Sequence, residues 1–400
     1  STHLSNMKAV VALGFLAPSV LAATVPNELF SSLVPQKILA TFNDLPNPTQ
    51  YPQYTDQRAG DWQYFNPNTW TSGFFPSTLY ALNTRRTLCG ATSRNGLGIA
   101  NWLELGREAS RALIPLETKN SQGHDVGFLS FPFVEELAVN PNSETAVTAI
   151  NSFAKLLANR FNPTVGCTRS WDAPDPDFQV IIDNMMNLEV LFHSAELTNN
   201  DTLRTIGKKH ADTTMINHIR QDGGTWHVLH YNTFTGAVTA KRTAQGFADS
   251  STWSRGQAWG IYGYATMFKL TGKTEYRDTA VRLADYFLDH IPNDGIVPWD
   301  FNAPSPKPAD SSAATIAANA LLLLSQLETT PSLKEKFSNA AIELLEKITE
   351  LAWNPSWQSL LSNGTVNAPA RNQLTGTVYG DYYFVKAGNE LISMGLASCT

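Results

Sequence analysis

Three stretches of the chain repeat one pattern, in which a helix of small or apolar residues leads through a short polar turn into an amphipathic helix. We expect these helix pairs at residues 188–197 and 202–219, 257–270 and 276–290, and 313–327 and 333–351. A helix that is apolar on all sides is buried, whereas an amphipathic helix turns one face to a core. The repeat therefore predicts an all-α toroid, with inner helices wrapped by outer helices.

Residues 181–192 form the stretch around which we expect the site to be organised. Their apolar side chains run nearly all the way round, which predicts one largely buried helix over this stretch. Asp183 stands near its front end, behind Ile181 and Ile182. It is either an N-cap, shared with Asn184, or a carboxyl group in a dry pocket. In a dry pocket, desolvation would raise its pKa, as a general acid near neutral pH requires.

Strand patterns are scarce, and the best covers residues 225–231, followed by a turn around residues 235–236. We expect it to form a hairpin within a loop. In a toroid, the loops that precede the inner helices gather at one end and form a cleft. Unusual polar and aromatic residues fall in those loops: Trp70, His124, Asp125, Trp171, Asp183, His227, Gln245, Arg255 and Trp259. Their shared position predicts a site at that end.

Two of these residues, Asp125 and Asp183, begin separate inner segments. Paired carboxyl groups beside a bound sugar can divide proton transfer and positioning between them. Asp125 has an alternative role as a helix cap, because it directly precedes an apolar helix start. Arg255 is flanked by two tryptophans, and its guanidinium suits either bidentate binding of an anionic group or a structural ion pair. The ten Trp and twelve Tyr of the chain are also compatible with a sugar-binding cleft or with a core.

Five segments resemble the signature segments of the unsaturated glucuronyl hydrolases, glycoside hydrolase family 88, and they occur in the expected order. They are Trp70-Thr71-Ser72-Gly73-Phe74, His124-Asp125-Val126-Gly127-Phe128, Ile182-Asp183-Asn184-Met185-Met186-Asn187, Trp253-Ser254-Arg255-Gly256-Gln257-Ala258-Trp259 and Asp381-Tyr382-Tyr383-Phe384. The resemblance implies an (α/α)6 barrel in a secreted or exported enzyme. It also implies the substrates, which are unsaturated uronate-containing oligosaccharides left by polysaccharide lyases.

The same resemblance implies that the C4–C5 double bond of the terminal uronate is hydrated and that the anomeric carbon is not attacked. Asp183 in its acid form would protonate C4, and then as a base it would deprotonate the water that adds at C5. Asp125 would hold sugar hydroxyls and help to orient the ring. Substrate contacts are implied for Trp70, His124, Trp171, His227, Gln245, Arg255 and Trp259, with the three tryptophans as stacking faces.

Two positions depart from the family pattern, because Gly123 and Ala244 stand where many relatives have histidines. This departure affects the contacts on the carboxylate side of the substrate, and hence substrate preference, but it does not involve Asp183.

Three other functions fit parts of the sequence. An unsaturated rhamnogalacturonyl hydrolase has the same fold and the same chemistry, although the run from Trp253 to Trp259 favours the glucuronyl type. A sugar 2-epimerase uses the same toroid but needs histidines as bases on the inner helices, where this chain has aspartates. A non-catalytic sugar-binding protein would keep the tryptophans but has no use for a buried carboxyl group behind Ile181 and Ile182.

We expect residues 1–23 to comprise upstream residues and a secretory signal peptide, because one lysine precedes a short apolar run that ends in small residues. We expect residues 24–400 to form a single catalytic domain, secreted and without a segment that spans a membrane. The formal charge is −6 and no basic run occurs, so nucleic acid is not an expected partner.

Cysteine and histidine spacing predicts no metal site, and we expect the enzyme to need no cofactor. Cys89, Cys167 and Cys399 allow one disulfide, whose pairing the sequence does not choose. We expect a monomer or a weak homodimer.

Overall fold

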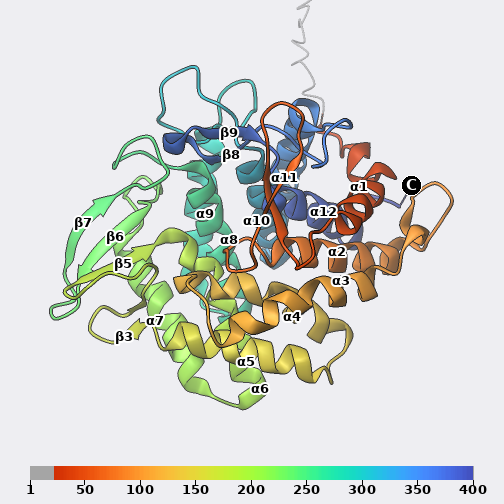
Figure 1. Cartoon of the computed structure of the whole chain (residues 1–400). Helices are drawn as coiled ribbons and strands as arrows, with labels where there is room; N and C mark the ends of the chain where they lie inside the picture. Colours follow the sequence, from red (N-terminus) through yellow and green to blue (C-terminus); the bar gives the residue numbers. More distant parts are fainter. Residues whose placement is uncertain (1–21, 400) are drawn as a thin grey trace, which may run out of the picture.

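The computed structural model describes residues 22–399, which are mostly helical (Figure 1). Contacts between the helices arrange them in two concentric rings. The α-helices are α1 (Leu33–Asn43), α2 (Phe74–Cys89), α3 (Trp102–Ser110), α4 (Val126–Val139), α5 (Glu144–Ala158), α6 (Glu189–Thr198), α7 (Asp201–Asn217), α8 (Ser254–Thr271), α9 (Thr274–Asp289), α10 (Ser311–Leu327), α11 (Pro331–Ala352) and α12 (Val378–Ser393). Short 3-10 helices are η1 (Asn27–Phe30), η2 (Leu97–Ile99), η3 (Arg111–Glu117), η4 (Gly123–Asp125), η5 (Ile182–Met186) and η6 (Ala368–Ala370).

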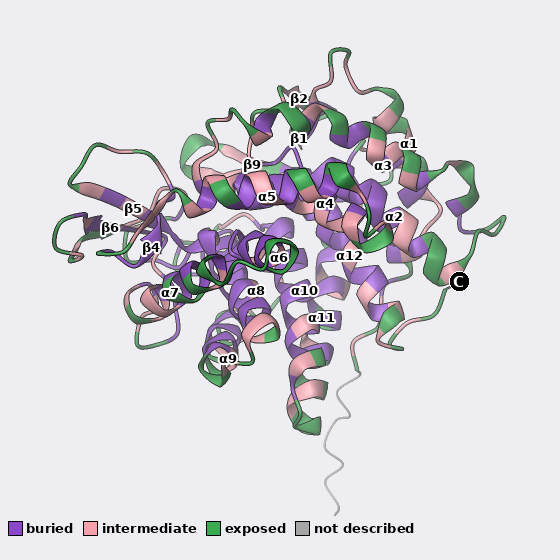
Figure 2. Ribbon diagram, turned by 90° about the horizontal axis from the view of Figure 1, so that it is seen from below, coloured by how far each residue is buried: buried purple, intermediate pink, exposed green. Residues whose placement is uncertain are grey.

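The even-numbered helices form the inner ring, in which each helix contacts the next and α12 closes the ring on α2. The odd-numbered helices from α3 to α11 lie outside, each packed against the inner helix that precedes it. Burial follows this division: α10 is buried almost throughout, whereas α11 has an exposed side (Figure 2). The all-α, (α/α)6 toroid that the repeated helix pairs and the family resemblance predict is thereby confirmed.

Short antiparallel strands occupy the loops between helices. Two-stranded sheets are β1 (Tyr51–Thr55) with β2 (Trp62–Phe65), β3 (Phe161–Asn162) with β4 (Cys167–Thr168), and β8 (Gly364–Asn367) with β9 (Asn372–Thr375). A three-stranded sheet consists of β5 (Asp177–Ile181), β6 (Val228–Asn232) and β7 (Val238–Arg242) and lies to one side of the rings (Figure 1). The hairpin predicted at residues 225–231 is confirmed as β6 and β7, whereas β5 was not predicted.

The prediction of one continuous helix over residues 181–192 is wrong. Ile181 ends strand β5, η5 follows it, and α6 begins only at Glu189. The cause is strand pairing, because Ile181 lies opposite Val228 in the sheet and the chain is extended up to that point. The segment is nevertheless as buried as its apolar pattern predicts, with Ile182 at 0% exposure.

The segment η5 lies directly against α8, at a point where Gly263 has no side chain. A Cβ atom at Gly263 would overlap the Cβ of Met185 and approach its backbone. A larger residue would therefore push η5 away from the helix. Because η5 also contains Asp183, this glycine fixes how deeply that carboxyl group lies in the barrel.

Cys89, at the end of α2, and Cys399 form a disulfide, while Cys167 is a buried free thiol. The structure thus settles the pairing that the sequence left open. The predicted signal peptide falls outside the described residues, apart from residues 22 and 23. Within residues 22–399, no helix combines the length and the hydropathy that a transmembrane span requires.

Candidate active site

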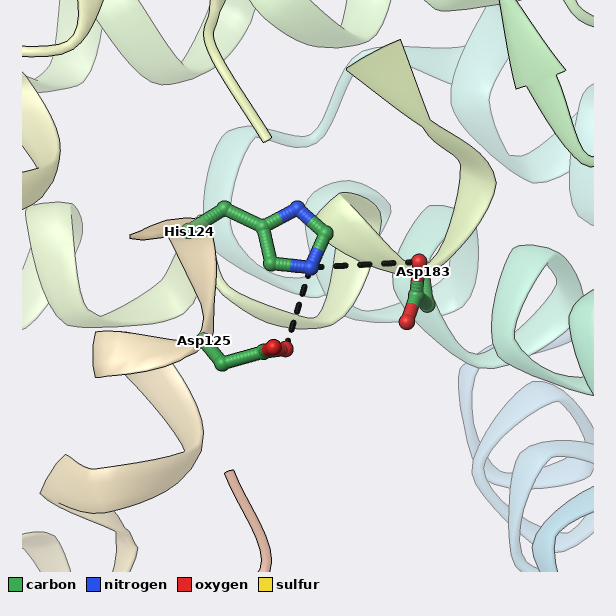
Figure 3. A group of neighbouring side chains, drawn as sticks. All are labelled: His124, Asp125 and Asp183. Atoms are coloured by element: carbon green, nitrogen blue, oxygen red, sulfur yellow. Dashed lines mark ion pairs between the residues drawn. The ribbon is translucent and has the colours of Figure 1, made fainter. Parts of the chain in front are cut away.

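The carboxyl groups of Asp125 and Asp183 converge on the imidazole of His124, at the end of the barrel where the inner helices begin (Figure 3). His124 Nε2 lies 3.0 Å from Asp125 Oδ1 and 3.9 Å from Asp183 Oδ1. The His124 side chain is 1% exposed, whereas those of Asp125 and Asp183 keep 13% and 17%. The imidazole is therefore enclosed, while both carboxyl groups remain open to a small ligand.

Neither aspartate serves as a helix cap, although both stand near a helix start. Asp125 occupies the N-cap position of α4 and Asp183 lies in the first turn of η5, but neither helix has a side-chain cap hydrogen bond. Oδ1 of Asp183 is buried without a hydrogen-bond partner, whereas Oδ1 of Asp125 faces the imidazole of His124 at 3.0 Å. The absence of a cap hydrogen bond excludes the capping alternative for both residues.

Asn187 joins the two segments that carry the aspartates. Its side-chain oxygen accepts a hydrogen bond from the backbone N–H of Phe128 at 3.0 Å, and its Nδ2 donates to the carbonyl of Asp183 at 3.4 Å. A side chain at Gly127 would collide with Asn187, so the start of α4 approaches η5 closely. The separation of the two carboxyl groups is thus set by this contact.

Burial raises the pKa of Asp183 to about 6, and although His124 opposes this rise, the Asp125 carboxylate adds to it. Its neighbours in η5 include Ile182 and Met185, which are 0% and 2% exposed and pack against α8. For His124, burial acts to lower the pKa, but the carboxylates of Asp125 and Asp183 outweigh it and the pKa is raised. Asp183 can therefore hold a proton in mildly acidic solution, which a general acid requires.

Ser170 orients the imidazole of His124. Its Oγ accepts a hydrogen bond from the backbone N–H of Ile181 at 2.9 Å and lies 2.7 Å from His124 Nδ1. In a neutral His124, the Ser170 hydroxyl donates to Nδ1, which leaves the proton on Nε2, facing the carboxyl groups. Sequence analysis missed Ser170 and the bridging role of Asn187, because a single serine or asparagine carries no pattern that distinguishes it.

His227 presents a second enclosed imidazole, with 3% exposure. Its Nδ1 accepts a hydrogen bond from the backbone N–H of Ala244 at 3.0 Å, so the proton of the neutral ring lies on Nε2. That Nε2 is buried and has no partner. Burial, and secondarily the charge of Arg255, lower the pKa of His227 well below its usual value. The ring is thus a neutral hydrogen-bond donor without an acceptor.

Arg255 forms the structural ion pair that was one of its two predicted roles. Its Nη1 lies 3.1 Å from Asp310 Oδ2, and the two side chains are 1% and 0% exposed. Its Nη2 donates to Gln245 Oε1 at 2.7 Å, which brings Gln245 into the same cluster. The guanidinium carbon lies 4.6 Å from the ring centre of Trp253. Sequence analysis missed Asp310, which also caps α10 through a hydrogen bond from Ser312 N at 3.0 Å.

The three predicted stacking tryptophans lie in different surroundings. Trp70 and Trp171 are partly exposed, as a stacking face requires. Trp259 is 0% exposed, and its ring lies 5.3 Å from that of Phe128 and 5.7 Å from that of Tyr383. The prediction that Trp259 offers a stacking face is wrong, because α8 turns its indole into the aromatic core of the barrel.

Ligand atoms of His124, Asp125 and Asp183 all lie within 4.8 Å of one another, which is a spacing that also fits a cation. Two carboxylates and an imidazole are common metal ligands in proteins. The expectation that the enzyme needs no metal therefore stays a prediction.

Fold and site together define a glycoside hydrolase of the helical-toroid class, with a raised-pKa carboxyl group beside a second one. The chain belongs to the family of unsaturated glucuronyl hydrolases: it is 35% identical over 330 residues to the enzyme of that name from Formosa agariphila, an alignment that covers 80% of this chain and 78% of the relative. It is 30% identical over 286 residues to the unsaturated glucuronyl hydrolase of Bacillus sp. strain GL1, with coverage of 67% and 74%.

The fold comparison agrees with this membership. A crystal structure of an unsaturated glucuronyl hydrolase specific for heparin matches with a TM-score of 0.83 at 28% identity and covers 94% of this chain and 98% of that one. No protein-family model matches the chain. The resemblance on which the sequence-based expectations depend is thereby confirmed.

Proposed function

We propose that the protein releases the terminal Δ4,5-unsaturated uronate from lyase-generated oligosaccharides, with Asp183 as the residue that hydrates the C4–C5 double bond. Relatives named unsaturated glucuronyl hydrolase and unsaturated chondroitin disaccharide hydrolase support this substrate class over a rhamnogalacturonyl one. The observation that carries the proposal is the carboxyl group of Asp183, whose pKa burial raises to about 6 at the mouth of the barrel.

The reaction uses one proton and one water. The unsaturated uronate is an enol ether, so Asp183 donates its proton to C4 and positive charge develops at C5 and the ring oxygen. Water adds to C5 and returns a proton to the Asp183 carboxylate, which restores the acid. The product is a hemiketal at C5. Its ring opens to a ketone at C5 and leaves a hemiacetal at C1, which collapses to an aldehyde and expels the rest of the oligosaccharide as an alcohol. Asp183 thus serves as acid and then as base.

Four neighbouring side chains would bind and orient the sugar. The carboxyl group of Asp125, whose side chain keeps 13% exposure, would accept hydrogen bonds from sugar hydroxyls. The unpartnered Nε2–H of His227 would donate to the uronate carboxylate, because a neutral imidazole donor is satisfied by an anionic acceptor. The partly exposed rings of Trp70 and Trp171 would cover the sugar faces.

A panel of unsaturated disaccharides that differ in the second sugar tests the proposal. The purified protein should abolish the ultraviolet absorbance of the double bond with at least one member of the panel and release a free uronate product. If no member loses absorbance while saturated sugars are isomerised, the epimerase alternative replaces the proposal.

The activity is expected to be greatest below about pH 6 and to fall tenfold for each pH unit above it. The active form of Asp183 is the protonated acid, and its pKa is raised to about 6, so raising the pH through that value removes the acid. The measurement is kcat/KM for an unsaturated disaccharide between pH 4.5 and 8.5. A profile that stays flat to pH 8 would contradict the assignment of Asp183 as the acid.

Replacing Asp125 by asparagine should lower kcat about 100-fold, as expected for a lost orienting contact near the reacting atoms. It should also shift the falling limb of the pH profile to lower pH, because the Asp125 carboxylate contributes to the raised pKa of Asp183. Both effects are read from one pH series of the variant. An unchanged limb would show that the two carboxyl groups do not interact in solution.

Secretion and oligomeric state form a separate part of the proposal. The predicted signal peptide and the disulfide between Cys89 and Cys399 support a secreted enzyme, because disulfides persist in oxidising compartments. We further propose a monomer or weak homodimer that binds neither nucleic acid nor membrane. Light scattering after gel filtration measures the mass directly.

A further inference from the structure

Three side chains form a hydrogen-bonded row across one face of the β5–β6–β7 sheet. Asp177 Oδ1 lies 2.7 Å from His230 Nδ1, and Arg242 Nε donates to His230 Nε2 at 2.8 Å. Arg242 Nη2 also lies 3.4 Å from Gln179 Oε1. The strand register places these residues on one face, because Gln179 lies opposite His230 and His230 lies opposite Ala240. The row holds the guanidinium of Arg242 in a fixed orientation.

The guanidinium of Arg242 keeps its positive charge largely free. Within residues 22–399 it has no carboxylate at ion-pair distance, since Asp177 contacts His230 instead. His230 accepts a hydrogen bond from Arg242 through Nε2, and an imidazole brings no negative charge to the guanidinium. An arginine that is oriented but not ion-paired can bind an anion from solution with little loss of side-chain entropy.

This charge lies beside residues of the candidate active site. The carbon of the Arg242 guanidinium is 5.9 Å from the ring centre of Trp171, which follows the residue that orients His124. On its other side, Arg242 precedes Thr243, whose Oγ1 lies 3.3 Å from His227 Nδ1. After burial and the charge of Arg255, the charge of Arg242 is among the causes that lower the pKa of His227. Arg242 is thus close to His227, and its guanidinium also approaches the ring of Trp171.

We propose that Arg242 is a specificity-determining residue that binds an anionic substituent, a sulfate ester or a carboxylate, on the sugar that follows the unsaturated uronate. The inference depends on the proposed function, because it assigns the second sugar to the space beside Trp171. A guanidinium held beside an indole can donate charge-assisted hydrogen bonds to sulfate or carboxylate oxygens, while the indole contacts the sugar ring. The enzyme should therefore prefer a charged second sugar to a neutral one.

The test compares KM for two unsaturated uronyl–hexosamine disaccharides that differ only in one sulfate ester. In Arg242→Gln, the ratio of KM for the sulfated substrate to KM for the unsulfated one should rise about tenfold. This is the effect expected from the loss of one charge-assisted hydrogen bond. Arg242→Lys should give a smaller rise, because it keeps the charge but loses the planar donor. High salt should move the wild-type ratio toward that of the glutamine variant.

Lys241→Gln is the matched control. It removes the same charge one residue away on the same strand, but Lys241 lies over Trp226, on the opposite face. The control should keep the wild-type KM ratio. An equal change of the KM ratio in both variants would show a general effect of net charge and would overturn the inference. The inference would also be overturned if Arg242→Gln kept the wild-type KM ratio and the wild-type melting temperature.

Binding separates this inference from the proposed function. Calorimetric titration of both disaccharides into Asp183→Asn, with and without Arg242→Gln, measures discrimination without turnover. If discrimination depends on Arg242 but the wild-type enzyme hydrates neither disaccharide, the proposed chemistry fails and the inference stands. If the wild type hydrates both disaccharides and Arg242→Gln leaves the ratio of their affinities unchanged, only the inference fails. Failure of both disaccharides to bind would overturn both proposals.

Discussion

Asp183→Asn is expected to lower kcat by about 10³-fold, within the range for a lost general acid–base group. The amide has nearly the same shape as the carboxyl group, but it can neither give a proton to C4 nor take one from water. Substrate binding should persist, because the contacts proposed for Asp125 and His227 remain. The measurement is the rate of loss of double-bond absorbance, followed at enzyme excess so that a slow single turnover is visible.

The variant should fold as well as the wild type, because it removes a carboxyl group from an apolar wall without changing volume. Asp172→Asn is a suitable control: it makes the same change on the loop beside the site, but its side chain is 82% exposed and pairs with Arg160. That control should retain wild-type turnover. If Asp183→Asn keeps more than a tenth of wild-type kcat, another group supplies the proton.

The toroid was predictable from the sequence because its signal is local. An inner helix of small and apolar residues and an outer amphipathic helix differ within a dozen residues of each other, as in α10 and α11. The end of the barrel that carries the site followed from the same pattern, since loops before inner helices must meet there. That argument predicts that Asp125, Asp183 and His124 lie close together.

Features that depend on distant parts of the chain could not be predicted in this way. Strand β5 exists because Ile181 pairs with Val228, and no local pattern indicates such a partner. The burial of Trp259 depends on how α8 is rotated about its axis, which neighbouring helices decide. Ser170 and Asp310 acquire their roles only when the fold brings His124 and Arg255 within reach.

The sequence also leaves the role of Arg255 open between two alternatives, and its burial in the structure decides between them. A guanidinium that binds substrate and one that forms an ion pair occur in the same sequence context. The deciding facts are the complete enclosure of Arg255 and Asp310 and the hydrogen bond from Arg255 to Gln245. Arg255 therefore supports the wall of the site through Gln245, whether or not it touches a ligand.

Asp310→Ala is expected to destabilise the protein by about 3–5 kcal/mol, because removing one partner leaves the other buried charge without compensation. The pair is enclosed, with 1% exposure for Arg255 and 0% for Asp310. The same substitution removes the cap of α10, since Asp310 Oδ1 accepts hydrogen bonds from Ser312 N at 3.0 Å and Thr365 N at 3.2 Å. The free energy of unfolding is measured by urea denaturation at neutral pH.

Asp285→Ala provides the contrast, because Asp285 pairs with Lys336 at 2.7 Å on the surface, with 43% and 47% exposure. Solvent screens that pair, so the expected cost is below about 1 kcal/mol. A double variant, Arg255→Met with Asp310→Leu, should recover part of the lost stability, since it removes both buried charges together. Equal losses for Asp310→Ala and Asp285→Ala would contradict the argument. Recovered stability without recovered turnover would show that the guanidinium is retained for the site and not for the fold.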